Sequence, residues 1–217
     1  MLIEIIKTII LGIVEGITEW LPISSTGHML LVDEFIQLDV TPEFKEMFLY
    51  VIQLGAILAV VILFWDKMWP FNFRDRSKPV IVKECFSLWF KVVVACIPGA
   101  VITLLFDDYV EAHLMTPTVI ALALIFYGIL FIVIENMNRK RVPKTTELKD
   151  ITYRTAFIIG LFQVLSIIPG TARSGSTIIG ALNIGVSRVA AAEFTFFLAV
   201  PVMIGMSLIQ VAKFALS

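Results

Sequence analysis

GIVEGITEWLPISSTGH, residues 12–28, places carboxylates, hydroxyls and a histidine inside an otherwise apolar N-terminal segment. Read as a helix, Glu15 and Glu19 are four residues apart and lie on one face. Gly12 and Gly16 form a pair of small residues that lets another backbone approach. A charged residue inside a membrane costs about 2.5–3.5 kcal/mol on insertion scales, so the two glutamates indicate a cation or a watery cavity, and hence a function.

The second half of this stretch is a turn. Pro22 ends the helix, and His28 begins the next apolar run. The residues between them can expose backbone N–H groups to an anion, and they include Ser24, Ser25, Thr26 and Gly27. Alternatively, Ser24 and Thr26 simply cap the following helix.

Composition places the chain in a membrane. Of its 217 residues, 59% are hydrophobic and 16% are charged, and the mean hydropathy is +0.93. These values lie well outside those of a soluble domain. The formal net charge of −1 gives no reason to expect a nucleic-acid partner, and the two cysteines form neither a disulfide framework nor a metal motif.

Apolar runs and loop charges predict a multi-pass topology. Four runs are expected to span the membrane: 48–65, 92–106, 118–134 and 194–214. The basic segments 66–91 and 135–154 should face the cytoplasm, and the acidic segments 33–46 and 107–116 should face outward. Two further apolar stretches, 1–32 and 156–186, are interrupted near their middle and are predicted to be re-entrant hairpins.

These interrupted stretches form a weak internal repeat. At an offset of 148 residues, Gly12 falls on Gly160, Glu15 on Gln163, Ser25 on Arg173, Thr26 on Ser174 and Gly27 on Gly175. The loop charges give the two units opposite orientations, so their tips should meet near the midplane. We therefore predict an all-α, polytopic integral membrane protein with inverted repeats, each a re-entrant broken helical hairpin followed by transmembrane helices. We expect residues 1–217 to form one membrane domain, with repeat one at 1–148 and a shortened repeat two at 149–217.

The second interruption reads PGTARSG, residues 169–175, and holds an arginine at a helix break. A guanidinium stays charged and binds phosphate through two parallel hydrogen bonds. A snorkelling arginine near the membrane surface is the alternative, but the apolar runs on both sides favour an anion ligand. Around Arg173 we expect Thr171, Ser174 and Gly175 to contact the phosphate. The hydroxyl and N–H groups of the first turn are expected to contact it as well.

If the two tips meet, the combined residues suit phosphoryl transfer. Glu15 and Glu19 would hold a divalent cation, Mg²⁺ or Ca²⁺, jointly with phosphate oxygens. Arg173 would clamp the phosphate. Ser25 would supply a nucleophile, and the nearby His28 would be either its proton acceptor or the acid for the leaving group. The alternative for the attack is a water with Glu19 as its base, in which case Ser25 only hydrogen-bonds the phosphate.

EGITEWLPISSTGH and PGTARSG resemble the two signature segments of the bacterial undecaprenyl-diphosphate phosphatase family, also called the bacitracin-resistance phosphatases. The segment 193–201, EFTFFLAVP, adds to the likeness. Ala172 departs from it, because many members have a hydroxyl residue there, and members usually carry two further spans beyond the end of this chain. The family's two glutamates, serine, histidine and arginine fall on Glu15, Glu19, Ser25, His28 and Arg173.

The resemblance implies an enzyme of the bacterial inner membrane that removes a phosphate from a polyprenyl diphosphate lipid with the help of a divalent cation. This reaction recycles the lipid carrier of cell-wall peptidoglycan synthesis and underlies bacitracin resistance. From the topology we expect the active site to open to the outer, periplasmic side, and the oligomeric state is left open. The alternative is a transporter or flippase that holds the lipid phosphate without cleaving it.

Overall fold

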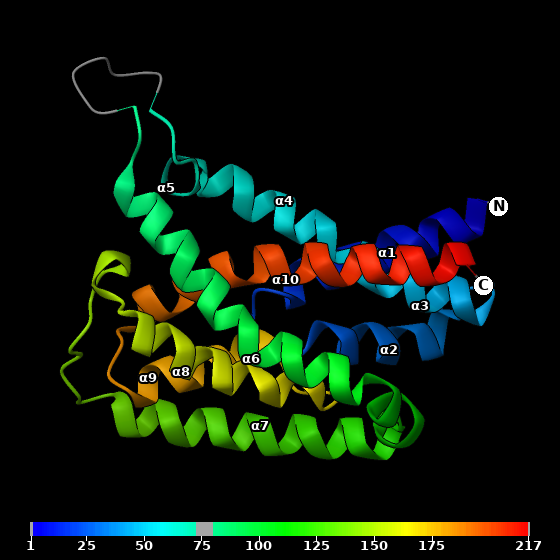
Figure 1. Ribbon diagram of the computed structural model, residues 1–217. Coiled ribbons are helices and arrows are strands. Elements are labelled where there is room, and N and C mark those ends of the chain that lie inside the picture. Colours follow the sequence, from blue (N-terminus) through cyan, green and yellow to red (C-terminus); the bar gives the residue numbers. More distant parts are fainter. Residues whose placement is uncertain (1, 73–79, 217) are drawn as a thin grey trace.

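The computed structural model describes residues 2–72 and 80–216, which form an all-α fold (Figure 1). In chain order its helices are α1 (Leu2–Thr18), α2 (Ser25–Ile36), α3 (Pro42–Val51), α4 (Gln53–Leu63), α5 (Trp65–Met68), α6 (Lys83–Leu114), α7 (Pro117–Asn138), α8 (Tyr153–Gln163), α9 (Arg173–Asn183) and α10 (Arg188–Leu216). Two short 3-10 helices, η1 (Leu148–Asp150) and η2 (Val164–Ile167), precede and follow α8. The predicted helical class is therefore confirmed.

Four segments are long and apolar enough to cross a membrane, namely Pro42–Leu63, Lys83–Phe106, Pro117–Asn138 and Arg188–Leu216. Three of them contain a run that the sequence predicted, and Pro42–Leu63 overlaps the fourth, 48–65, whose last residue, Trp65, belongs to α5. A polytopic membrane protein is therefore confirmed. The first of them consists of α3 and α4, which are separated only by Ile52.

The sequence placed both ends of one helix, α6, wrongly. Residues 83–91 were assigned to a basic loop and 107–114 to an acidic turn, yet both belong to α6. The charged residues at each end are compatible with helical backbone, and the tertiary contacts decide the boundary. Lys91, for example, is buried, and its Nζ donates to the Lys149 carbonyl at 3.1 Å.

Both interrupted stretches break close to the predicted positions, although α1 already ends at Thr18, before Pro22, and the last residues of each predicted interruption belong to α2 and α9. The first hairpin, α1 and α2, and the second hairpin, α8 and α9, approach from opposite ends of the molecule, and their tips meet near its middle (Figure 1). Ser25 and Arg173, which the repeat offset pairs, are the first residues of α2 and α9. The re-entrant passage through the membrane and the repeat boundary after residue 148 remain predictions.

Helix α10 forms the centre of the packing. Its fully buried Phe194, Phe197 and Met203 belong to the main core cluster, which also contains Ala95 of α6 and Ile159 of α8. Glycine makes the contact between α6 and α8 possible, because a Cβ on Gly160 would lie 2.3 Å from the Ala95 carbonyl oxygen. The second hairpin is therefore held against α6 by direct backbone contact.

The predicted topology can be tested at both ends of the bundle. Figure 1 shows the chain between α7 and α8 at the same end as α5, and the turns α2–α3 and α6–α7 at the other end. In a background with Cys85 and Cys96 changed to alanine, we expect Asp39→Cys to react with an impermeant thiol reagent in intact cells. Lys140→Cys should react only after permeabilisation, because basic loops stay in the cytoplasm. The reverse pattern would overturn the assigned orientation.

Candidate active site

The first tip, residues 19–24, is built by a helix stop and a strained cap. Helix α1 ends at Thr18, and the chain turns through Pro22 before α2 begins. Ser24 is the N-cap of α2, and its Oγ accepts a hydrogen bond from the Gly27 N–H at 3.3 Å. Its φ of 65° is rare for a residue with a side chain. Such backbone strain is typical of functional turns that the surrounding fold over-determines.

The second tip, residues 168–172, is built differently. After η2 the chain turns at Gly170, whose φ of +89° suits glycine, and α9 begins at Arg173. The N-cap Ala172 makes no side-chain hydrogen bond to the helix. The first turn of α9 therefore lacks the cap that Ser24 gives to α2.

An ion pair joins the two tips. Arg173 Nη2 donates to Glu19 Oε1 at 2.7 Å, across 154 residues of sequence. Glu19 is 7% exposed, and a buried carboxylate needs a partner. Removing one member of a buried pair typically costs about 3–5 kcal/mol, because the other charge is left uncompensated. The pair therefore constrains how the tips meet.

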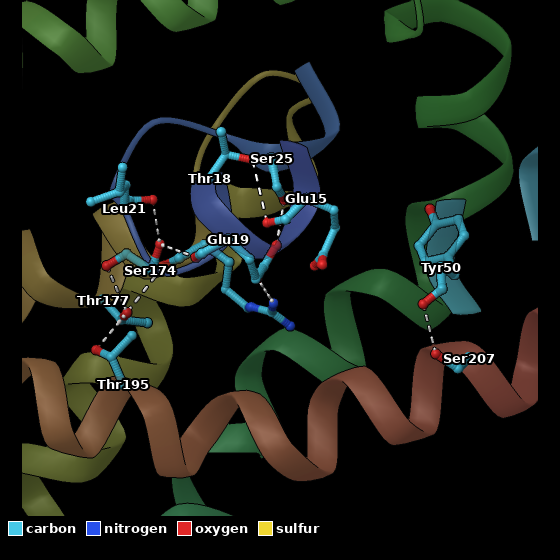
Figure 2. Close-up of polar contacts among 11 residues, drawn as sticks. Glu15, Thr18, Glu19, Leu21, Ser25, Tyr50, Ser174, Thr177, Thr195 and Ser207 are labelled. Atoms are coloured by element: carbon cyan, nitrogen blue, oxygen red, sulfur yellow. Dashed lines mark hydrogen bonds and ion pairs between the residues drawn. The ribbon is translucent and has the colours of Figure 1, made fainter. Parts of the chain in front are cut away.

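The same carboxylate binds a hydroxyl. Ser25 Oγ donates a short hydrogen bond to Glu19 Oε2, and Ser25 is itself buried (Figure 2). Glu19 thus contacts Arg173 with one oxygen and Ser25 with the other. An ionised acceptor on a serine hydroxyl withdraws its proton and raises its nucleophilicity.

Backbone contacts complete the junction. Ser174 Oγ lies 3.3 Å from the Leu21 carbonyl and 3.5 Å from the Glu19 carbonyl, so the first turn of α9 rests on the first tip (Figure 2). A Cβ on Gly175 would lie 3.4 Å from both Cβ and O of Pro22. The structure therefore brings Glu19, Ser25, Arg173, Ser174 and Gly175 together, as the sequence predicted.

Glu15 stands apart from this network. Its side chain is 2% exposed, and its Oε1 has no hydrogen-bond partner in the described part of the chain. The charges of Glu19 and Arg173 act on it. An orphaned buried carboxylate oxygen beside a second carboxylate is what a bound cation would satisfy. The described residues contain no group of three or more metal-ligating side chains, so the phosphate oxygens of a substrate would have to supply further ligands.

His28 has a different partner from the expected one. Its Nδ1 lies 2.8 Å from the Ser24 carbonyl oxygen, one helical turn back. No hydrogen bond joins His28 to Ser25 in the residues that the structure describes, and Glu19 occupies the place of proton acceptor. The spacing of three residues suggested that the His28 imidazole could reach the Ser25 hydroxyl. In the structure that hydroxyl donates to Glu19 across the tip instead.

The remaining predicted residues line the tips without joining the Glu19 network. Thr171 and Gly27 are buried and Thr26 is half-buried. Sequence reasoning missed Thr177 and Thr195, whose hydroxyl oxygens lie 2.9 Å apart next to the first turn of α9. The available signal was the threonine among the apolar residues of EFTFFLAVP.

An apolar groove of about 620 Å³ runs beside the site, between α1, α4 and Phe196 of α10. Glu15 lies on its wall, and apolar or small residues form the rest of the described lining, including Trp20, Val60 and Leu63. Gly12 and Gly16 also line it. They were expected to pack against another helix backbone, yet nothing in the described chain lies within 4 Å of a Cβ built on Gly16.

Fold and site together define a polytopic membrane protein with a buried carboxylate–hydroxyl–guanidinium centre of the kind that phosphoryl transfer uses. Comparison with known proteins is more specific. The family model described as "Bacitracin resistance protein BacA" matches residues 8–217, and the chain belongs to this family.

Several relatives carry the name undecaprenyl-diphosphatase. The chain is 69% identical over 212 residues to one from Enterococcus faecalis, and 59% identical to one from Lachnoclostridium phytofermentans. Each alignment covers 98% of this chain and 77% of the relative. One from Streptococcus thermophilus is 54% identical over 98% of this chain and 73% of its own length.

The ion pair predicts a strict requirement for arginine. Arg173→Lys should lower the turnover of the chain's phosphatase activity about 100-fold or more, because a point charge cannot contact Glu19 and a phosphate with the same planar fork. The matched control is Arg188→Lys, whose exposed ion pair with Glu135 lies at the helix surface and should change turnover less than about twofold. Phosphate release from the purified variants measures both. Equal turnover of Arg173→Lys and the native protein would make Arg173 structural.

Proposed function

We propose that the junction of the two tips hydrolyses undecaprenyl diphosphate to undecaprenyl phosphate and inorganic phosphate. The observation that carries this function is the Ser25 hydroxyl bound to Glu19, with Arg173 on the other oxygen of the same carboxylate. The names of the relatives support the same reaction. The chain is then an enzyme, and the transporter alternative is not favoured, because a transporter needs no activated nucleophile.

Ser25 is the proposed nucleophile. Its Oγ attacks the terminal phosphorus, its proton passes to Glu19 Oε2, and the bond from that phosphorus to the bridging oxygen breaks. Undecaprenyl phosphate leaves with the bridging oxygen. A water then attacks the phosphoserine, so that inorganic phosphate is released and Ser25 regains its proton.

Arg173 and the two helix starts supply the anion site. The ion pair occupies only Nη2 of the guanidinium, so its other N–H groups can bind phosphate oxygens. Helices α2 and α9 both begin at the junction, and the free N–H groups of helix N-termini favour anions. Ser24, Thr26, Gly27, Thr171, Ser174 and Gly175 remain the proposed substrate contacts, with His28 as the candidate acid for the leaving group.

Glu15 and Glu19 are the proposed ligands of a divalent cation, Mg²⁺ or Ca²⁺. The orphaned Oε1 of Glu15 fits such an ion, and Mg²⁺ commonly binds through one or two carboxylates and substrate phosphates. When bound, the cation would neutralise charge on the diphosphate. The protein's own part is to hold two carboxylates beside the phosphate.

The groove beside Glu15 is the proposed seat of the prenyl chain. It joins the site at the Glu15 carboxylate, and its apolar walls match a hydrocarbon. A lipid lying there would present its diphosphate to the tips without leaving the membrane. We further place the enzyme in the bacterial inner membrane with the site open to the outer side, where it recycles the carrier lipid of cell-wall synthesis. The resulting supply of undecaprenyl phosphate would account for bacitracin resistance.

Phosphate release by the purified chain tests the function. With undecaprenyl diphosphate and Mg²⁺ we expect steady release of inorganic phosphate, which EDTA stops and added Mg²⁺ restores. Glu15→Gln should lower the rate at least about 100-fold and raise the Mg²⁺ concentration needed. Glu34→Gln, at an exposed position of α2, is the control. Binding of the lipid without phosphate release would reject the enzyme in favour of the transporter.

Substrate length tests the groove. Gly16→Leu should fill the groove and raise KM for undecaprenyl diphosphate about tenfold, because one or two buried isoprene units lose their contacts. KM for a diphosphate with a single isoprene unit should change little. Gly128→Leu is the matched control, since Gly128 is an exposed glycine of α7 with nothing within 4 Å of a Cβ. Equal effects of Gly16→Leu on both substrates would place the prenyl chain elsewhere.

A further inference from the structure

A pair of buried threonines, Thr177 and Thr195, lies next to the first turn of α9 (Figure 2). Thr177 of α9 is 0% exposed and Thr195 of α10 is 4% exposed, and their Oγ1 atoms are 2.9 Å apart. Thr177 Oγ1 also lies 3.0 Å from the Arg173 carbonyl and 3.1 Å from the Ser174 carbonyl.

The direction of these hydrogen bonds follows from the number of hydroxyl protons. Each threonine has one proton to donate, and a carbonyl can only accept. Thr177 therefore gives its proton to the carbonyls of Arg173 and Ser174, and Thr195 gives its proton to Thr177. A chain of hydrogen bonds runs from α10 to the backbone of the first turn of α9.

That turn has little other local support. Its N-cap Ala172 offers no side-chain oxygen, whereas the equivalent turn of α2 has the Ser24 cap. Yet the turn carries both side chains that reach across the junction, Arg173 to Glu19 and Ser174 to Leu21. Its orientation therefore decides where the guanidinium lies.

We propose that Thr195 is a positioning residue that acts through Thr177 to hold the first turn of α9, and with it Arg173, in register with Glu19. The inference rests on the proposed phosphatase function. It gives a role to the threonine of the segment EFTFFLAVP, which lies on the core helix α10 and not on either hairpin. Thr195 itself need not contact the substrate.

The test compares two lost hydroxyls on one helix. Thr195→Val keeps the side-chain shape and removes the donor. Ser207→Ala removes a buried hydroxyl farther along α10 that donates to the Tyr50 carbonyl at 2.9 Å (Figure 2). We expect similar losses of thermal stability in both variants. Only Thr195→Val should lower kcat, about tenfold and with KM changed less than about twofold, because a small displacement of a group that binds the transition state mainly affects the chemical step.

Two further variants connect the effect to Arg173. Thr195→Ser keeps the donor and should restore most of kcat. In an Arg173→Lys background, Thr195→Val should cause little additional loss, because residues that act through one group are not additive. If Thr195→Val does not accumulate in the membrane, Thr195→Cys, with its weak S–H donor, should show an intermediate kcat.

Either of two results would overturn the proposal: a kcat for Thr195→Val, or for Thr195→Cys in its place, that equals that of Ser207→Ala, or a Thr195→Ser variant as impaired as Thr195→Val. The native protein is assayed in the same series. Absence of phosphate release from the native protein would reject the proposed function. Normal release from both the native protein and Thr195→Val would reject only the role of Thr195.

Discussion

The Glu19 carboxylate is the contact on which the site depends. It is buried, and its two oxygens bind Arg173 and Ser25, one from each hairpin. A charge in an apolar interior is tolerated only when it is paired and hydrogen-bonded. The contact therefore constrains how the tips meet, and the same contact holds the proposed nucleophile, Ser25, and the proposed anion-binding group, Arg173, on one carboxylate.

An apolar surrounding strengthens the effect of the few charged groups at the site. Electrostatic interactions strengthen where water is excluded, so few charges suffice to stabilise a phosphoryl group. Two helix starts add fixed partial charges at the junction. The apolar groove at Glu15 is the proposed place of the prenyl chain. In that proposal the diphosphate would lie at the charged tips and the hydrocarbon along α1 and α4.

The sequence predicted the parts of the fold that depend on local chemistry. Pro22 and the PGTARSG segment marked the regions where the helices break. Contacts across the fold could not be predicted in this way. Arg173 was expected to bind phosphate, and its ion pair with Glu19 was not predicted. The spacing between Ser25 and His28 suggested a pair, but the carboxylate of Glu19, directly after α1, binds the serine instead. The ends of α6 and the buried Thr177–Thr195 pair were missed for the same reason. Both depend on contacts with neighbouring helices, which local sequence does not show.

The central claim is that Glu19 makes Ser25 the nucleophile, and the stereochemistry at phosphorus tests it most directly. Undecaprenyl diphosphate whose terminal phosphorus is a thiophosphate made chiral with oxygen isotopes would be hydrolysed in isotope-labelled water, and the configuration of the released thiophosphate determined. Attack by Ser25 followed by attack of water involves two in-line displacements, so the account predicts retention of configuration. Inversion would mean a single displacement by water. It would leave Glu19 as the base for that water and reduce Ser25 to a hydrogen-bonding residue.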